Sequence, residues 1–139
     1  MASPPIPIQC VATRQRLCAA VRKGTRVVDF FTRWYPPPEE RLAHLDRLRR
    51  SVGSMSPLLL VDLDAAPDLS VALGIVVLPH LLVFRGGRKV ARCIGSLPSL
   101  DAAEQLARRV LESHTEVSCH FVRGVMHPVP YFKEHPCRN

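Results

Sequence analysis

Residues 28–38 read Val-Asp-Phe-Phe-Thr-Arg-Trp-Tyr-Pro-Pro-Pro and carry the strongest structural signal in the chain. The apolar run that ends at Phe31 is typical of a strand that is buried on both faces of a sheet. Three consecutive prolines follow, and proline suits the first turn of a helix because that turn needs no N–H donor. The sequence therefore predicts a central strand, an abrupt turn that contains Trp34 and Tyr35, and a helix that begins after Pro38.

The rest of the chain alternates strands with helices. The predicted strands cover residues 8–12, 25–31, 58–62, 81–84 and 89–94, and the first of these is an edge strand because prolines precede it. The predicted helices run from a cap at Thr13 to about Arg22, from the prolines to about Val52, from Pro67 to Leu73, and from a cap at Ser99 to about Leu111. This order predicts an α/β protein with a central mixed sheet of four to five strands and helices on both of its faces.

Several ordered motifs in the chain resemble those of the thioredoxin family. Residues 28–38 are similar to the family pattern V-D-F-W-A-x-W-C-G-P-C, with Trp34 and Pro37 matching and Tyr35 and Pro38 at the two cysteine positions. Residues 58–64 are similar to the family's central strand and its V-D-x-D segment, and residues 76–84 to its G-I-P-T-L-x-x-F segment. The resemblance extends from near Gln15 to near Ser113 and implies a thioredoxin-like fold in which the bond before Pro79 is cis.

The resemblance also implies a degenerate redox site made of Asp29, Trp34, Tyr35, Pro36, Pro37 and Pro38. A phenol and a pyrrolidine ring can neither attack nor form a disulfide, so we expect no thioredoxin chemistry at this turn and no catalytic residue. Asp29 matches the family's buried carboxylate, while Leu60 stands where the family has a lysine. We expect water or a backbone donor to satisfy Asp29, because an unpaired buried charge is unfavourable.

A partner groove is a second implication of the resemblance. Thioredoxins hold extended peptides beside the cis-proline, and the corresponding groove here would consist of Trp34, Tyr35, Leu78 and Pro79. Main-chain pairing at Leu78 would not require a cysteine. The alternative is that Pro79 only shapes its turn and Trp34 only packs, although the same face could still dock one permanent neighbour.

The composition favours a basic protein that contacts an acidic surface. The 139 residues carry a formal net charge of +7, and arginine supplies 16 of the 19 basic side chains. Such a balance suits contact with nucleic acid phosphates, although a solvated basic surface without a partner is equally compatible with it. No run of apolar residues approaches the roughly 18 that a membrane-spanning helix needs.

The cysteines and histidines give only a weak indication of a metal site. The five cysteines form no C-x-x-C pair, and we expect Cys18 and Cys93 to act as small apolar side chains. Four of the six histidines lie beyond residue 113, and the weak candidate ligands are Cys119, His120, His135 and Cys137. Their spacing fits no familiar zinc motif, so we expect neither a metal nor a cofactor.

The two ends of the chain indicate import and partner binding. Five basic residues and no acidic one precede Asp29, a bias that favours a mitochondrial rather than a cytoplasmic location. Residues 1–12 are expected to form an extension with a possible edge strand, residues 13–113 the thioredoxin-like domain, and residues 114–139 an irregular tail. Because the tail mixes prolines with aromatic side chains, we expect Phe121, Tyr131 and Phe132 to bind a partner.

Four functions remain open from the sequence alone. The favoured interpretation is a redox-inactive structural subunit of a large assembly, most simply a mitochondrial ribosome, where arginines could also meet rRNA phosphates. An accessory subunit of a mitochondrial respiratory complex is the next alternative. A peptide-binding, chaperone-like module that uses the groove beside Pro79 is the third, and an atypical oxidoreductase that uses Cys93 or a tail cysteine is the fourth. The first two imply protein partners and no free monomer.

Overall fold

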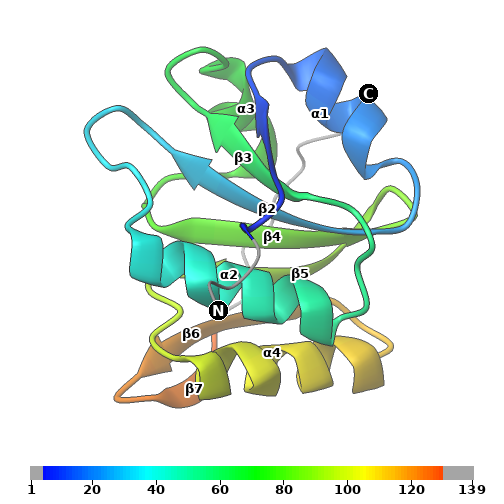
Figure 1. Cartoon of the computed structure of the whole chain (residues 1–139), viewed down its shortest axis with the longest axis vertical. Coiled ribbons are helices and arrows are strands. Elements are labelled where there is room, and N and C mark those ends of the chain that lie inside the picture. The colour runs from blue at the N-terminus through cyan, green and yellow to red at the C-terminus, as the bar shows by residue number, and fades with distance from the viewer. Residues whose placement is uncertain (1–4, 130–139) are drawn as a thin grey trace.

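The computed structural model describes residues 5–129, which form a seven-stranded sheet with helices on both faces (Figure 1). The elements in chain order are β1 (Ile8–Val11), α1 (Arg14–Val21), β2 (Thr25–Phe31), α2 (Glu39–Ser51), β3 (Leu58–Asp62), α3 (Asp68–Leu73), β4 (His80–Arg85), β5 (Arg88–Ile94), α4 (Leu100–Glu112), β6 (Val117–Val122) and β7 (Val125–Pro128). None of the helices within residues 5–129 is long and apolar enough to cross a membrane.

The sheet is mixed and has the strand order β1-β3-β2-β4-β5-β6-β7. The β1–β3, β3–β2 and β5–β6 pairs are parallel, and the β2–β4, β4–β5 and β6–β7 pairs are antiparallel. Residues 26–30 of β2 are all buried, as the apolar run predicts for a strand covered on both faces. The predicted α/β class, with a mixed sheet and flanking helices, is confirmed.

Two layers of helices cover the sheet and make two hydrophobic cores. Leu45 of α2 and Leu106 of α4 pack in the core on one face. Leu17 of α1 and Leu69 of α3 pack in the core on the other face. Figure 1 shows α2 and α4 side by side in front of the sheet, so the turn that precedes α2 lies at the edge of this layer.

The helix starts follow from the local sequence. The side chain of Thr13 accepts a hydrogen bond from the backbone N–H of Arg16, and that of Ser99 accepts one from the N–H of Ala102, so both predicted caps form. No side chain caps α2, which begins directly after Pro38. Its first turn carries acidic side chains, which the helix dipole favours at that end.

The segment after α4 is not the irregular tail that the sequence indicated. Its described part forms β6, which pairs in parallel with β5, and β7, which becomes the edge of the sheet. The tight turn at Arg123-Gly124 makes this hairpin possible, because both residues have positive φ, 52° and 77°. Pro128 is tolerated because it ends an edge strand. The sheet therefore has seven strands instead of four to five, and the domain continues to at least residue 128.

Candidate functional site

The degenerate motif forms an exposed turn between β2 and α2. The backbone N–H of Tyr35 donates to the carbonyl of Thr32 at 3.0 Å, which closes a tight turn after the strand. Trp34 is 85% exposed and Tyr35 is 47% exposed, so neither ring is part of the protein's core. Neither position carries a sulfur. This turn presents aromatic surface and carries no thiol.

A small groove joins this turn to the loop that contains Pro79. The Leu78–Pro79 peptide bond is cis, as the resemblance implied. The groove has a volume of about 170 Å³ and is lined by Tyr35, Pro38, Glu40, Arg41, His44, Pro79, Ser96, Leu97 and Pro98. Of the predicted groove residues, Tyr35 and Pro79 both line this groove. Trp34 is absent from the lining, and Leu78 packs against the core formed with α1 and α3. The lining contains no cysteine.

Arg41 is the buried partner of Asp29, and the sequence interpretation missed it. Its Nε donates to Oδ2 at 2.9 Å and its Nη2 donates to Oδ1 at 2.7 Å, so the pair is bidentate. Asp29 is 1% exposed and Arg41 is 7% exposed. Burial raises the pKa of the Asp29 carboxyl, and the guanidinium of Arg41 opposes that rise. A backbone hydrogen bond at Phe30 also stabilises the carboxylate, so the expected backbone donor is present, but the principal partner of Asp29 is a side chain from α2.

A second buried polar pair lies directly behind Pro79. Arg92 donates from Nη1 to His80 Nε2 at 2.8 Å, and from Nη2 to the carbonyl of Leu73 at 2.9 Å. Arginine has no acceptor, so His80 accepts at Nε2 and is the neutral tautomer with its proton on Nδ1. Burial, followed by the charge of Arg92, lowers the pKa of His80 to about 4. Arg92 therefore ties the loop after α3 to the strand that follows the cis-proline.

The predicted metal ligands do not converge. Cys119 and His120 are consecutive in β6, so their side chains point to opposite faces of the sheet. His120 instead stacks on His127 of β7, with ring centroids 5.7 Å apart. Within residues 5–129 no group of three or more His, Cys, Asp or Glu side chains could hold a metal ion. His135 and Cys137 lie outside the described residues.

Two other predictions about single residues are corrected. Cys18 is exposed instead of packed, because Leu17 and Val21 form the buried face of α1. Phe121 is half-buried against the core under α2 and α4, so it is not a free partner-binding side chain. Cys93 is buried, as expected of a small apolar residue. Tyr131 and Phe132 lie outside the described residues, and their predicted role stays a prediction.

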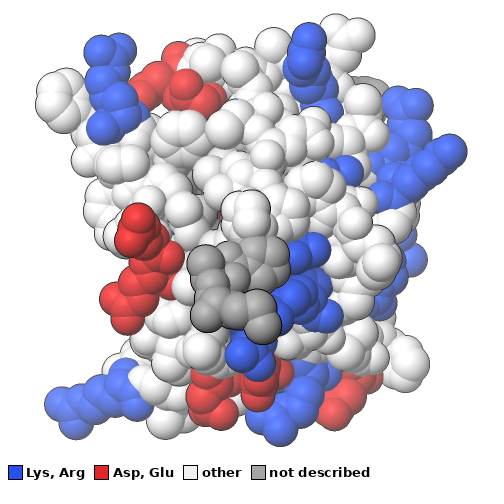
Figure 2. All heavy atoms as spheres, viewed as in Figure 1, with Lys and Arg blue, Asp and Glu red and all other residues white. Residues whose placement is uncertain are grey.

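Basic side chains converge where α1 ends and the β4–β5 turn closes. The backbone N–H of Gly87 donates to the carbonyl of Val21 at 2.9 Å, which brings this turn against the end of α1. We call the exposed cations gathered there the basic end: Arg22, Lys23, Arg85 and Arg88. Among the described residues, none of the four is in an ion pair. Figure 2 shows Lys and Arg gathered on this right-hand side of the molecule.

Comparison with known proteins gives one consistent relationship, although no family model matches the chain. The thioredoxin of Staphylococcus haemolyticus is 26% identical over 90 residues, which cover 65% of this chain and 86% of that protein. The thioredoxin of Staphylococcus aureus is 27% identical over the same shares. Among solved structures, the thioredoxin of Malassezia sympodialis has a TM-score of 0.60 at 16% identity, covering 78% of this chain and 97% of its own. The oxidised thioredoxin of Plasmodium falciparum has a TM-score of 0.59 at 19% identity, covering 73% and 96%.

The sheet order, the cis-proline loop and the turn before α2 define an α/β protein of the thioredoxin-like class. The chain has a thioredoxin-like fold and is similar in sequence to thioredoxins over 90 residues. It departs from the family motif at Tyr35 and Pro38, the positions where the motif has its two cysteines.

Proposed function

We propose that this protein is a redox-inactive, thioredoxin-like structural subunit of a large assembly, with a mitochondrial ribosome as the first candidate. The observation that carries the proposal is the turn before α2, which has kept an exposed tryptophan and lost both sulfurs. Without a thiolate, this turn can neither open a disulfide nor hold a mixed disulfide. What it retains is an exposed aromatic pair beside a groove, which suits binding.

The basic end supports an assembly that contains RNA. Guanidinium and ammonium groups contact phosphates without reading sequence, and such contacts position a protein on nucleic acid. Arg85 and Arg88 are register partners across the β4–β5 hairpin, and both are exposed. A rigid two-strand turn thus carries two arginines beside Arg22 and Lys23. The basic N-terminal segment favours a mitochondrial location. In mitochondria, the alternative assembly is a respiratory complex, in which the protein would be an accessory subunit.

Charge reversal at the basic end tests this function. The wild-type chain is expected to co-sediment with a large particle and to be released as the salt concentration rises. Each phosphate contact steepens the fall of the logarithm of the binding constant with the logarithm of salt concentration by about 0.7–0.9. For the Arg85→Glu/Arg88→Glu variant, the particle-bound fraction at about 0.15 M salt should be at least about tenfold lower than for wild type, because both phosphate contacts become repulsive. Bound fractions are measured by gradient sedimentation of extracts, and mass spectrometry of the co-sedimenting chains identifies the assembly.

The matched control is Arg108→Glu/Arg123→Glu, which makes the same charge change at two exposed sites on α4 and the β6–β7 turn. It should sediment like the wild type. A wild-type chain found only as a free monomer would contradict the proposal, as would reduction of insulin disulfides by the purified protein. Deleting residues 114–139 is not a suitable test, because it would remove Val117 and Cys119 from the core.

A peptide-binding module is the second candidate, favoured by the groove beside the exposed Trp34. The Trp34→Ala variant should change the free energy of unfolding by no more than about 0.5 kcal/mol, because the ring is almost fully exposed. Urea denaturation measures this, with the fully buried Leu45→Ala as a control that should lose about 2–5 kcal/mol. If the protein binds clients, Trp34→Ala should also abolish suppression of client aggregation. Unaltered suppression would count against client binding through the exposed turn that carries Trp34, and a large loss of stability would show that the ring packs against the protein.

A further inference from the structure

Cys93 and Cys119 are direct neighbours across two strands. Cys93 of β5 and Cys119 of β6 are register partners in the parallel pair, and both side chains lie in the core under α2 and α4. Adjacent strands are about 4.8 Å apart, which lies inside the Cα separation of roughly 4.4–6.8 Å that a disulfide spans. Both cysteines are free thiols in the structure. The register therefore places the two cysteines at a Cα spacing that a disulfide can span.

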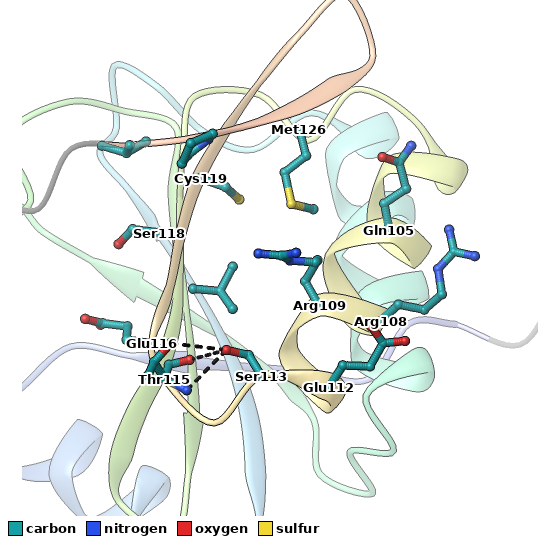
Figure 3. Close-up of a pocket in the computed structure, with 13 residues that line it drawn as sticks. Gln105, Arg108, Arg109, Glu112, Ser113, Thr115, Glu116, Ser118, Cys119 and Met126 are labelled. Carbon is teal, nitrogen blue, oxygen red and sulfur yellow. Dashed lines mark hydrogen bonds between the residues drawn. The ribbon is translucent and has the colours of Figure 1, made fainter.

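A cleft leads to one of these sulfurs. It has a volume of about 940 Å³ and lies between α4 and the β6–β7 hairpin, with Cys119 and Met126 in its wall. Figure 3 shows the sulfur of Cys119 and the guanidinium of Arg109 both pointing into the space between α4 and β6. Cys119 is 1% exposed, whereas Cys93 is fully buried and does not line the cleft. A small molecule in the cleft would therefore meet Cys119 before Cys93.

The electrostatics divide the two thiols into different roles. A hydrogen bond from the Cys93 thiol, with a contribution from the charge of Arg109, lowers the pKa of Cys119 although burial opposes this. The same hydrogen bond, together with burial, raises the pKa of Cys93. Since the thiolate is the nucleophile, Cys119 is suited to react first and Cys93 to react second.

We propose that Cys119 and Cys93 are a hydroperoxide-reactive thiol pair that closes reversibly to a disulfide between β6 and β5. The Cys119 thiolate attacks the peroxide; an S–O bond forms, the O–O bond breaks, and the leaving oxygen takes a proton as water or an alcohol. The sulfur of Cys93 then attacks the sulfenic acid of Cys119; the S–S bond forms, and the hydroxyl leaves as water with the proton of Cys93. Two thiols lose two electrons in total, and one hydroperoxide gains them.

This pair is separate from the turn that carries Tyr35 and Pro38, and the redox inactivity proposed above refers to disulfide exchange at that turn, not to this pair. The oxidised form links β6 covalently to β5, and thereby fixes the wall of the cleft against the sheet. A dithiol reductant would open the bond again by exchange.

The test uses the full chain with Cys10→Ser, Cys18→Ser and Cys137→Ser, which leaves only the pair. Hydrogen peroxide at low excess should consume both remaining thiols, lower the mass by two hydrogens, and give a peptide in which Cys93 and Cys119 are linked. Dithiothreitol should restore both thiols. A triple variant that keeps both thiols, or that forms only dimers through intermolecular disulfides, would overturn the proposal.

Further variants assign the roles. Adding Cys93→Ser should leave a sulfenic acid at Cys119 that dimedone traps, and adding Cys119→Ser should leave Cys93 unreactive. Arg109→Gln should slow thiol loss severalfold, while Arg108→Gln, which lines the same cleft, should not. Equal rates for the two glutamine variants would contradict the role of Arg109. Insulin reduction is measured in parallel: turnover there would overturn the proposed function and leave the peroxide reaction to be judged on its own result.

Discussion

Replacing Arg41 with leucine is expected to lower the free energy of unfolding by about 3–5 kcal/mol at pH 7, because removing one partner of a buried ion pair leaves the other charge uncompensated. The Asp29 carboxylate lies in the middle of β2, and both of its oxygens accept hydrogen bonds from Arg41. Leucine supplies neither donor nor charge. Urea denaturation at pH 7, followed by the midpoint and slope of the transition, measures the loss.

Two comparisons test whether the loss of stability comes from the unpaired charge of Asp29. The Asp29→Leu/Arg41→Met double variant should recover most of the stability, because apolar replacement of a whole buried pair is often close to neutral. In Arg41→Leu the pKa of Asp29 should rise further, since the guanidinium no longer opposes burial. A raised folded pKa makes the native state take up a proton as pH falls. This proton uptake stabilises the folded variant, so its deficit in unfolding free energy relative to wild type should shrink between pH 7 and about pH 4. A deficit that stays constant over this range would contradict the buried-carboxylate explanation.

The turn before α2 could be predicted from the sequence because its signals are local. Residues 25–31 form the expected strand, and Trp34 and Tyr35 lie in the expected turn. Buried-strand composition, prolines that precede a helix, and capping side chains all act within a few residues of the structure that they determine. The same reason explains why the caps at Thr13 and Ser99 were predicted correctly.

Arg41 could not be assigned from local signals, although one pattern pointed to it. It lies four residues before Leu45 and seven before Leu48, so helical spacing places it on the buried stripe of α2. A charged residue at such a position needs a buried partner. That partner, Asp29, comes from another element, and only the packing of α2 on β2 brings the two groups together.

The hairpin after α4 was missed for a different reason. Its turn residues, Arg123 and Gly124, adopt positive φ, although arginine is not a residue that usually predicts such a turn. The parallel pairing of β6 with β5 then depends on which edge of the sheet is open after α4. Because Cys93 and Cys119 meet only through this pairing, the thiol pair could not be read from a sequence without a C-x-x-C motif.

Acidification from pH 7 to pH 4 is expected to lower the free energy of unfolding by about 3 kcal/mol through His80 alone. The native state holds this side chain neutral, fully buried and accepting from Arg92, and burial lowers its pKa from 6.5 to about 4. The direction of the pH effect on stability follows from which state, folded or unfolded, takes up the proton. Above pH 6.5 both states are neutral and the shift has no effect, but between pH 6.5 and 4 only the unfolded state binds the proton. Stability is therefore lost across this window, and urea denaturation at several pH values measures it.

The His80→Asn variant separates this contribution from other acid effects. An asparagine side-chain oxygen can accept a hydrogen bond from Arg92, yet it does not titrate. The variant should be less stable than wild type at pH 7, because it loses the edge-on packing of the His80 ring against Phe30. Between pH 6.5 and 4 its stability should fall by about 3 kcal/mol less than that of wild type, so the two curves converge. Parallel curves would mean that His80 takes up its proton at the same pH in the folded and the unfolded protein. The lowered pKa, and with it the neutral acceptor assigned to His80 from the arginine contact, would then be wrong.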